Sequence, residues 1–518
     1  MGVLENLHTG LENGRKRAKE PTDVRFRLSE LHHTSYDLYD ETDPNSAGIV
    51  DIGTPFDSLI SHFTTDASGT PDDTTSEQET LANDSSEPQP TASTAEPVTS
   101  ANEVTEPHPI PAASNPAPSP TNTLTLGDNL AYMKWLLANG YEGQFRVIYI
   151  DPPFFTKGTY DATITLRSED GKSHKIKHLA YDDTFDRSLE CYAENMTARL
   201  ILMKQLLADD GLIWVHLDWH SCSYVKILMD EIFGAKNFQN EIIWQYKSGG
   251  SGTKHFARKH DTILVYSKAA NFRLHVPKEK SYNRDFKPYR FKGVTEYQDE
   301  IGWYTMVNMK DIWPIDMVGR TSKERNGYAT QKPLELMRRI ITSSTEEGDL
   351  CGDFFCGSGS FLEAANELNR RWIGCDSEAL AVSVTRRRMD EIRASYTCYR
   401  DPWESIPGTF EMEEVTAVPM RDGRKLITAR VRAFNPEIEY GHIPLKDRDV
   451  AAHIGETSPL RYLDYLMVDP EYNGQFTSRM ICPGDAPQIQ FPTGGSYAII
   501  AVDVFGKEYW YGKEPQER

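Results

Sequence analysis

The sequence predicts an α/β fold, a parallel sheet with helices on both faces, followed by a small β-rich C-terminal domain. Three observations support this prediction. Between residues 123 and 399, apolar strand-like runs alternate with segments of helical spacing, which is typical of a sheet covered on both sides. One apolar run leads into the glycine turn Gly357-Ser358-Gly359, and a helical pattern follows it. After residue 400, long β-type runs follow one another with little helical pattern between them.

The strands and helices are expected in a fixed order along residues 123–399, the candidate catalytic domain. Apolar runs predict the strands, and apolar residues three or four apart predict the helices. The strands are expected at 124–128, 146–150, 212–217, 242–246, 262–266, 350–355 and 372–375. The helices are expected at 129–137, 189–207, 225–233, 334–342, 361–368 and 380–392. An inserted hairpin is expected within 159–187, where two β-type runs flank an Asp170-Gly171 turn signal.

Most of the negative charge lies in one segment. The net charge is −21, yet residues 35–125 hold sixteen Asp and Glu and no Lys or Arg, which leaves −5 for the rest of the chain. This segment is rich in Ser, Thr and Pro, so we expect an acidic disordered linker over 35–122, after an N-terminal segment 1–34 with a short helix. A second interpretation of the linker stays open, an acidic arm that competes with nucleic acid for a basic cleft.

Cysteine usage and hydropathy indicate a cytoplasmic protein without a metal centre. The seven cysteines are scattered and none stands in a C-x-x-C pair, so the sequence predicts neither a disulfide framework nor a zinc site. The N-terminus lacks the apolar core of a signal peptide, and no apolar run approaches the length that spans a membrane. We therefore expect no metal and no contact with a membrane.

The glycine turn is one half of a candidate site. Glycines let the backbone approach a ligand closely, and doubly wound sheets bind nucleosides at the carboxyl ends of their strands. Asp376 ends the next expected strand, nineteen residues beyond Gly357, where an acid can accept hydrogen bonds from ribose hydroxyls. Leu362 stands where a third glycine would be, which disfavours NAD. A lone G-x-G is otherwise an ordinary turn.

The block Asp151-Pro152-Pro153-Phe154 is the other half. It follows directly on an expected strand. Proline removes backbone donors and stiffens a turn, so the Asp151 carboxylate and the Pro152 carbonyl would be fixed acceptors. Two acceptors suit an exocyclic amino group of a base, which becomes nucleophilic as its hydrogens are held. Phe154 could stack on that base, which would have to leave its helix. Taken alone, the block is equally an ordinary strand-to-loop turn.

Together the two blocks resemble the β-class amino DNA methyltransferases, closest in texture to the modification subunits of type III restriction systems. The resemblance covers about 124–395. It includes Leu126–Leu130, Tyr328–Leu334 and Arg370–Asp376, and the catalytic block precedes the cofactor loop. It implies a Rossmann-like, S-adenosylmethionine-dependent methyltransferase fold with circularly permuted motif order.

The resemblance also implies roles for individual residues. Asp128 would contact the adenine side of S-adenosylmethionine, Lys332 and Pro333 its methionine end, and Asp218 would form a wall of the target pocket. Phe154 stands where Tyr is commonest in the family. The catalytic residues implied are Asp151, Pro152, Pro153 and Phe154. The cofactor-binding residues implied are Asp128, Lys332, Pro333, Asp353, Phe355, Cys356, Gly357, Ser358, Gly359 and Asp376.

A basic, aromatic stretch predicts the contact with nucleic acid. Residues 245–292 hold twelve Lys and Arg against three Asp and Glu, with eight Tyr and Phe among them. This balance suits phosphate contacts, although a solvated basic face is the plainer alternative. The segment 245–325 occupies the family's target-recognition position. The DNA-binding residues predicted are Lys247, Lys254, His255, Arg258 and Lys259.

The leading hypothesis is a site-specific methyltransferase that acts on the N6 amino group of adenine in double-stranded DNA, with the target base flipped out. Asp at the first position of the catalytic block resembles the adenine-N6 enzymes more than the cytosine-N4 enzymes. Cytosine-N4 methylation, RNA methylation and a non-catalytic DNA-binding or assembly subunit of the same fold stay open. The type III resemblance implies a homodimer, and whether a restriction subunit accompanies the protein as a partner stays open.

Overall fold

A computed structural model describes most of the chain outside the predicted linker. It covers residues 2–21, 27–32, 122–168, 170–185, 188–247, 253–319, 321–326, 328, 330–400, 408–474, 476–486 and 488–512. The prediction of an acidic linker over 35–122 falls outside the described residues, apart from Asn122.

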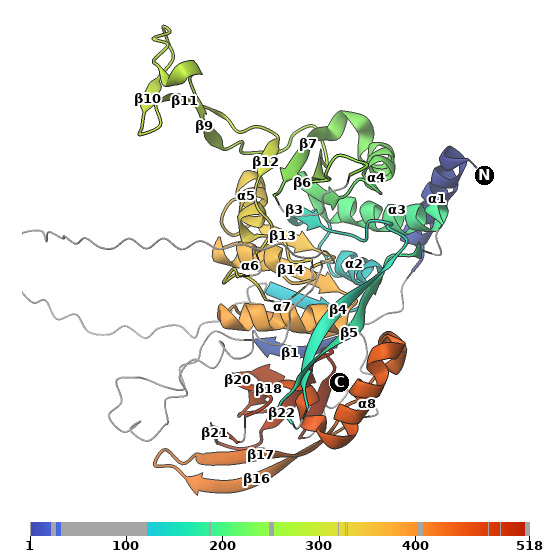
Figure 1. Cartoon of the computed structure of the whole chain (residues 1–518), viewed down its shortest axis with the longest axis vertical. Coiled ribbons are helices and arrows are strands. Elements are labelled where there is room, and N and C mark those ends of the chain that lie inside the picture. Colours follow the sequence, from blue (N-terminus) through green and yellow to red (C-terminus); the bar gives the residue numbers. More distant parts are fainter. Residues whose placement is uncertain are drawn as a thin grey trace, which may run out of the picture. The chain divides into compact units, whose positions relative to one another are not determined.

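One large sheet holds the described part of the chain together (Figure 1). Among the described residues it has eleven strands, in the order β12-β7-β8-β6-β3-β13-β14-β2-β15-β1-β19. In that order they are Ile312–Pro314, Phe238–Gln245, His260–Ser267, Leu207–Leu217, Phe145–Ile150, Leu350–Asp353, Arg371–Asp376, Asn122–Leu126, Tyr396–Arg400, Arg27–His32 and Phe476–Ser478. The strands predicted within 124–376 are all present.

The sheet is mixed, whereas the sequence predicts a parallel one. Neighbouring strands from β6 to β15 are parallel, but β8 is antiparallel to both β6 and β7, and β1 is antiparallel to β15. An apolar run reports burial on both faces and not strand direction, so the reversal could not be read from it.

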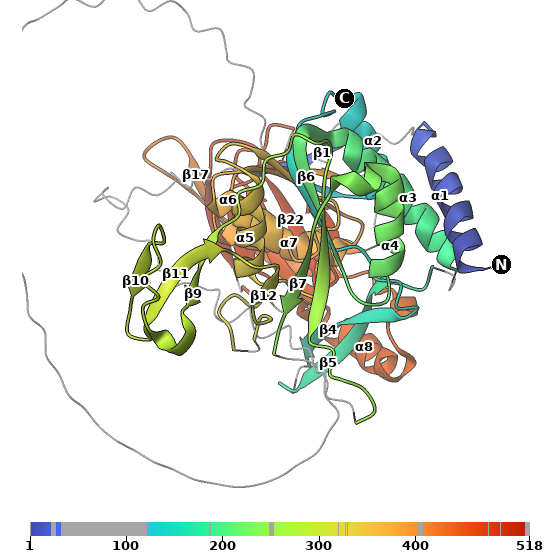
Figure 2. The same ribbon diagram turned by 90° about the horizontal axis from the view of Figure 1, so that it is seen from above.

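Helices cover both faces of the sheet, as expected (Figure 2). In β3, Ile148 and Ile150 pack into one core cluster, while Val147 and Tyr149 pack into the other. The first cluster contains α2 (Asn129–Ala138), α3 (Leu189–Leu206) and α4 (Cys222–Met229). The second contains α5 (Leu334–Ser344), α6 (Ser360–Glu367) and part of α7 (Ala379–Glu391).

The N-terminal helix α1 (Val3–Lys19) packs closely against α3. Two glycines allow this approach. A Cβ atom on Gly10 would lie 2.6 Å from the Cβ of Ala193, and one on Gly14 would lie 2.5 Å from the Cβ of Thr197. The sequence predicts a helix in this segment but not its packing against α3.

The predicted hairpin is present as β4 (Thr159–Arg167) and β5 (Ser173–Asp182). One face of it, with Ile164, Leu166 and Ile176, packs into a core cluster formed mainly by the C-terminal region. The hairpin therefore begins beside the catalytic block and reaches into the C-terminal core.

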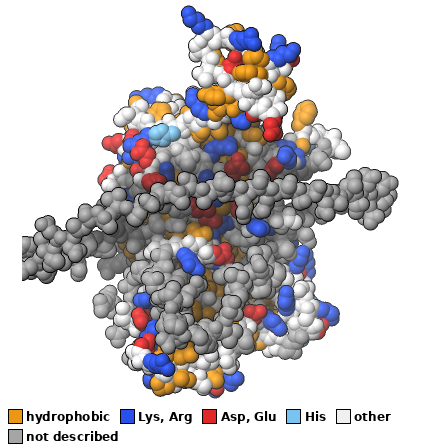
Figure 3. Space-filling model, turned by 90° about the vertical axis from the view of Figure 1, so that its left-hand side faces the viewer, with side chains coloured by type: hydrophobic (Ala, Val, Ile, Leu, Met, Phe, Trp, Pro, Cys, Tyr) orange, Lys and Arg blue, Asp and Glu red, His pale blue; other side chains and the backbone are white. Residues whose placement is uncertain are grey.

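The segment 245–325 contains strands of the main sheet as well as an insertion. Both β8 and β12 belong to the main sheet. Between them, β9 (Lys278–Tyr282), β10 (Glu296–Gln298) and β11 (Trp303–Asn308) form a separate sheet, here called the arm. Phe286 and Phe291, between β9 and β10, are exposed. Lys and Arg side chains gather at the far end of the arm (Figure 3).

In its described residues, the C-terminal region forms two small antiparallel sheets and one α-helix, and it also contributes β19 to the main sheet. The strands of the first sheet are β16 (Thr409–Pro419), β17 (Lys425–Asn435) and β21 (Ile489–Thr493). Those of the second are β18 (Leu463–Asp469), β20 (Met480–Pro483), β22 (Ala498–Asp503) and β23 (Glu508–Tyr511). The helix α8 (Leu445–Thr457) is not predicted from the sequence, whereas the β-rich character is.

This region is joined to the catalytic domain by buried ion pairs. Arg386 of α7 pairs with Glu508 at 2.8 Å, and both side chains are buried. Gly506 lies so close to the start of α7 that a Cβ atom on it would be 2.4 Å from the carbonyl oxygen of Ala379.

Two chain positions, one just before the predicted linker and one at its end, lie near each other. His32, at the end of β1, and Asn122, at the start of β2, are both register partners of Tyr396 in β15. In the part of the chain that the structure describes, no helix is both long and apolar enough to cross a membrane.

Candidate active site

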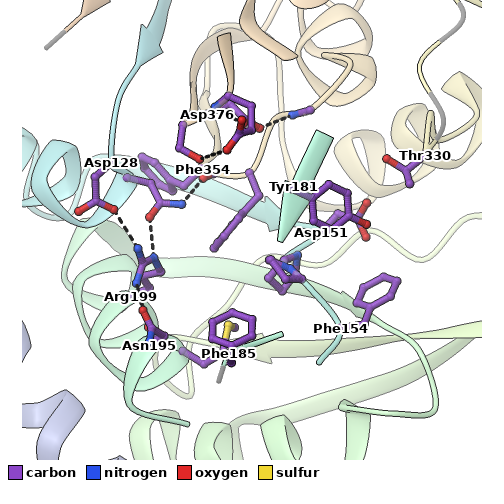
Figure 4. A pocket seen from close by; sticks show the side chains of 18 of the residues that line it. Asp128, Asp151, Phe154, Tyr181, Phe185, Asn195, Arg199, Thr330, Phe354 and Asp376 are labelled. Atoms are coloured by element: carbon purple, nitrogen blue, oxygen red, sulfur yellow. Dashed lines mark hydrogen bonds and ion pairs between the residues drawn. The ribbon is translucent and has the colours of Figure 1, made fainter. Parts of the chain in front are cut away.

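A cavity of about 340 Å³ lies at the carboxyl ends of β3, β13 and β14 and brings the two predicted halves together (Figure 4). Its volume falls in the range of small-molecule sites. The predicted residues that line it are Asp128, Asp151, Pro152, Pro153, Phe154, Lys332, Phe355, Gly357 and Asp376. An adjoining cavity of about 30 Å³ adds Asp353, Cys356 and Ser358. Pro333 and Gly359, also predicted, line neither cavity.

The glycine turn adopts a backbone that other residues resist. Gly357 has φ 49° and Gly359 has φ 74°. A Cβ atom on Gly359 would lie 2.7 Å from a methyl of Thr385, so this glycine is needed for packing as well as for conformation. The hydroxyl of Thr385 donates to the carbonyl of Gly357 at 2.8 Å and fastens the turn to α7.

Asp376 organises the turn from the end of β14. One carboxylate oxygen accepts from the backbone N–H of Gly357 at 2.8 Å, and the other accepts from that of Glu378 at 3.0 Å. Burial raises the pKa of Asp376, and these backbone hydrogen bonds oppose the shift. Burial and the charge of Asp376 raise the pKa of Glu378 to about 7. Both acids line the cavity.

The other end of the cavity is built around Arg199, which the sequence does not single out. Asp128 is the N-cap of α2 and pairs with Arg199 of α3 at 2.9 Å. Arg199 also donates to Asn129 at 2.6 Å, and Asn129 donates to the carbonyl of Phe354 at 2.6 Å. This chain ties α3 and α2 to the strand-to-turn connection after β13.

Asp151 has one partnered and one free carboxylate oxygen. Oδ2 contacts the ammonium group of Lys332, which the sequence places among the cofactor ligands. Oδ1 is buried and has no hydrogen-bond partner. Phe154 lies beside His216, with ring centroids 6.1 Å apart and an interplanar angle of 23°. Asp151 and Phe154 therefore flank a place where a planar group with N–H donors can bind.

Asp183 holds the backbone that follows the catalytic block, and sequence reasoning missed it. Its carboxylate accepts from the backbone N–H groups of Phe155 and Thr156, each at 2.8 Å, and from the hydroxyl of Thr156 at 2.7 Å. Phe155 and Lys157 have positive φ values of 59° and 61°. The only signal was an acidic pair at the end of the predicted hairpin.

Asp218, expected as a wall of the target pocket, is not among the residues that line the cavity. It follows β6 and hydrogen-bonds His220, its Oδ2 lying 2.6 Å from the imidazole Nδ1. Behind Phe154, His216 instead joins Tyr149 at 3.0 Å and Asp261 at 3.2 Å. Among the described residues, no three His, Cys, Asp or Glu side chains gather as a metal site would require.

The predicted DNA-binding residues are exposed in part and paired in part. Lys254 and His255 are exposed beside the fully exposed Phe256. Arg258 stacks over the exposed ring of Trp219, 3.8 Å from its centroid. Lys247 pairs with Asp316 at 3.0 Å, and Lys259 donates to the carbonyl of Lys247 at 3.0 Å. The glycine-rich stretch 249–252 lies outside the described residues.

The fold and the cavity define an α/β enzyme domain that places a fixed acid beside a nucleoside-type glycine turn. Residues 145–387 match the N6/N4 methylase family model, described as DNA methylase. The match covers slightly less than half of the chain, and it confirms the expected class of enzyme, a DNA methyltransferase.

Curated relatives agree in class. The Type II methyltransferase M.EcaI of Enterobacter cloacae is 28% identical over 327 residues, which cover 52% of this chain and 69% of that protein. The DNA adenine methyltransferase YhdJ of Escherichia coli strain K12 is 25% identical over 275 residues, 52% of this chain and 82% of that protein.

The similarity to a type III modification subunit covers a smaller part of the chain than residues 124–395, over which the sequence suggests it. The EcoP15I Mod subunit of Escherichia coli is 26% identical over 214 residues, which cover 37% of this chain and 32% of that protein.

Among solved structures, the M1.HpyAVI–SAM complex is 17% identical, with a TM-score of 0.33, over 52% of this chain and 98% of that one.

Proposed function

We propose that this protein transfers a methyl group from S-adenosylmethionine to the N6 amino group of adenine in double-stranded DNA. One observation carries the proposal: Asp151, with its buried free oxygen, lines the same cavity as the glycine turn and Asp376. The DNA methylase match over 145–387 supplies the class of reaction.

The side chains that line the cavity suit a cationic nucleoside. Four carboxylates, those of Asp128, Asp151, Asp376 and Glu378, face two cations, Arg199 and Lys332. S-adenosylmethionine carries a net positive charge, two ribose hydroxyls and an adenine ring. Acids at the strand ends accept from the hydroxyls, and Tyr181, Phe185 and Tyr328 provide apolar walls.

The chain's own contribution to the reaction is to hold the amino group. The cofactor supplies a sulfonium methyl carbon, whose C–S bond breaks as the new N–C bond forms and leaves a neutral thioether. Asp151 Oδ1 accepts one amino hydrogen, which favours a tetrahedral nitrogen, and then takes the proton that the methylated nitrogen must lose. Phe154 stacks on the base, which has left its helix to reach the cavity.

Adenine is the proposed base for two reasons. Asp stands first in the catalytic block, as the resemblance implies for adenine-N6 enzymes. In addition, YhdJ, which the chain resembles over 52% of its length, is named a DNA adenine methyltransferase.

The deciding experiment identifies the product. The full chain is incubated with methyl-labelled S-adenosylmethionine and unmethylated genomic DNA, and the DNA is digested to nucleosides. We expect labelled N6-methyl-2′-deoxyadenosine. Labelled N4-methylcytosine would overturn the choice of base, and label in no nucleic acid would overturn the function.

A matched pair of variants tests the acceptor. Asp151→Ala removes both oxygens and should slow transfer by about a hundredfold or more, as expected for loss of a preorganised polar group in an active site. Asp151→Asn should be impaired to a similar degree, because its amide oxygen would accept from Lys332, its NH2 group would replace the free acceptor, and an amide cannot take the proton. Both should still bind S-adenosylmethionine in calorimetry. An Asp151→Ala protein with undiminished transfer would contradict the assignment.

We also propose that the protein is the modification component of a restriction system and works as a homodimer, with Lys254, His255 and Arg258 on the DNA backbone. The resemblance to type III subunits is the reason for proposing a restriction subunit and a second copy of this chain as partners. Light scattering of the purified chain tests the dimer, since a monomer at micromolar concentration that methylates normally would exclude it.

A further inference from the structure

Lys332 lies against the catalytic acid and is held inside the site. Its Nζ contacts Oδ2 of Asp151, and the side chains of the two residues are only 12% and 18% exposed. Lys332 directly precedes Pro333 and α5, while Asp151 follows β3, so the pair joins two elements far apart in the chain.

The contact fixes the orientation of the Asp151 carboxylate. A carboxylate held through one oxygen cannot rotate freely about its χ2 bond, so the other oxygen keeps one direction. Here that other oxygen, Oδ1, is buried and has no hydrogen-bond partner. The pair therefore presents a single unused acceptor next to Phe154, whose ring centroid lies 5.9 Å from the Lys332 ammonium.

The charge of Lys332 acts on a second acid near Asp151, the buried Asp353. Burial raises the pKa of Asp353 well above its usual range, and the charge of Lys332 opposes that shift. Arg199, the other cation lining the cavity, pairs with Asp128 at the opposite end. Each end of the cavity thus has its own acid–cation pair, and only the Lys332 pair contains the catalytic acid.

We propose that Lys332 is a positioning residue for Asp151 and not a ligand of the cofactor. It holds Oδ2 so that Oδ1 stays directed at the amino group of the target base. This inference rests on the proposed function, and it reassigns a residue whose place in the sequence suggests contact with the cofactor's methionine end.

Two substitutions of the same kind separate the two roles. Lys332→Met removes the charge but keeps an unbranched side chain, and Arg199→Met does the same at the other end. We expect Lys332→Met to lower kcat by about a hundredfold while the Kd for S-adenosylmethionine, measured by calorimetry without DNA, stays at the wild-type value. Arg199→Met should raise that Kd and reduce kcat much less.

The conservative variant and a double variant complete the test. Lys332→Arg keeps the cation and should recover most of the lost kcat. In the Asp151→Asn background, Lys332→Met should slow single-turnover transfer little further, because residues that act through one another are not additive. Equal melting temperatures of the variants would show that folding is intact.

Two outcomes would overturn the inference. One is a Lys332→Met protein that binds S-adenosylmethionine as weakly as it reacts slowly, which would make Lys332 a cofactor ligand. The other is full multiplication of the two effects in the double variant. Failure of the proposed function is a separate result, since it shows as a wild-type protein that labels no DNA.

Discussion

At the scale of single residues, Asp183 is the main residue outside the catalytic block that fixes the backbone next to it. It accepts three hydrogen bonds from the two residues that follow Phe154. Left-handed backbone costs a non-glycine residue about 1–2 kcal/mol, and two such residues, Phe155 and Lys157, occur here. Asp183 offsets this cost and so keeps Asp151 and Phe154 in place.

Asp183→Asn should therefore impair both stability and activity. The amide presents donors where the backbone also donates, so about 1–3 kcal/mol of unfolding free energy should be lost, and kcat should fall with it. Asp161→Asn, on the same hairpin but in a half-exposed pair with Lys177, is the control and should change neither. Chemical denaturation and steady-state kinetics measure the two quantities. Equal behaviour of both variants would refute the role of Asp183.

Some site residues could be predicted from the sequence and others could not, for a physical reason. Asp151, Gly357 and Asp376 stand at ends of apolar strands, and parallel strand ends meet at one edge of a sheet. Arg199 and Asp183 act through contacts across long stretches of chain, and a single sequence holds no signal for such pairs.

At the scale of elements, the loop between β7 and β8 is the strongest candidate for phosphate contacts. Lys254 and Arg258 are exposed there, and Arg258 is braced on Trp219 rather than paired with an acid. By contrast, Lys259 donates to the carbonyl of Lys247, and the Lys247 side chain forms an ion pair with Asp316. The loop therefore differs from the uniformly solvated basic face that composition alone would allow.

Replacing both Lys254 and Arg258 by Ala should weaken binding to all DNA sequences alike. Each phosphate contact contributes about 0.9 to the slope of log K against log salt, so the slope should fall by about 1.8. Lys172→Ala, on the turn of the β4–β5 hairpin, is the control and should leave the slope unchanged. Fluorescence anisotropy between low and moderate salt gives the slopes, and an unaltered slope in the double variant would remove this loop from the interface.

The prediction of elements succeeded where burial alone determines them. The buried strands and amphipathic helices of 123–399 show the expected periodicity. β19, at the edge of the main sheet, has only three residues, and β1, its inner neighbour, has the mixed sequence RLSELH, so neither contains an apolar run. Both strands are held by pairing with their neighbours. Helix α8 has a weakly apolar face with Ala451 and Ile454 buried, which a β-type neighbourhood conceals.

At the scale of the whole molecule, the C-terminal region braces the catalytic domain at two points. The turn between β22 and β23 touches the start of α7 through Gly506, and its Phe505 ring lies 4.7 Å from His178 on the hairpin. The hairpin leads into Asp183, and α7 begins just after Asp376. Both walls of the cavity thus depend on the same turn.

Acid should loosen this brace. Burial, followed by the charge of His442, lowers the pKa of His178 from 6.5 to about 4; Lys507 acts in the same direction and Glu439 against it. Between pH 6.5 and about 4, His178 binds a proton in the unfolded chain but not in the folded chain. The free energy of unfolding therefore falls as the pH drops from 6.5 toward 4. Above that window the group has no effect.

The variant His178→Phe keeps a ring against Phe505 without a titrating group. We expect its melting temperature, relative to wild type, to rise steadily as pH falls through this window, while both proteins share the effects of all other groups. Differential scanning calorimetry at several pH values makes the comparison. Parallel curves would mean that His178 does not contribute to acid sensitivity.

His32 and Asn122 stand opposite the same residue, Tyr396, so evolution can change the length of the chain between them at little cost to the sheet. Two strand spacings, about 10 Å, separate the two positions, so a short chain is long enough to connect them. Closure entropy grows slowly with loop length, so we expect insertions or deletions between the two positions to change the stability of the sheet little. A Gly/Ser bridge of about six residues has the required reach. Exchanging residues 33–121 for it should leave melting temperature and methyl transfer as they were, and a loss of either would show that the segment has a task of its own.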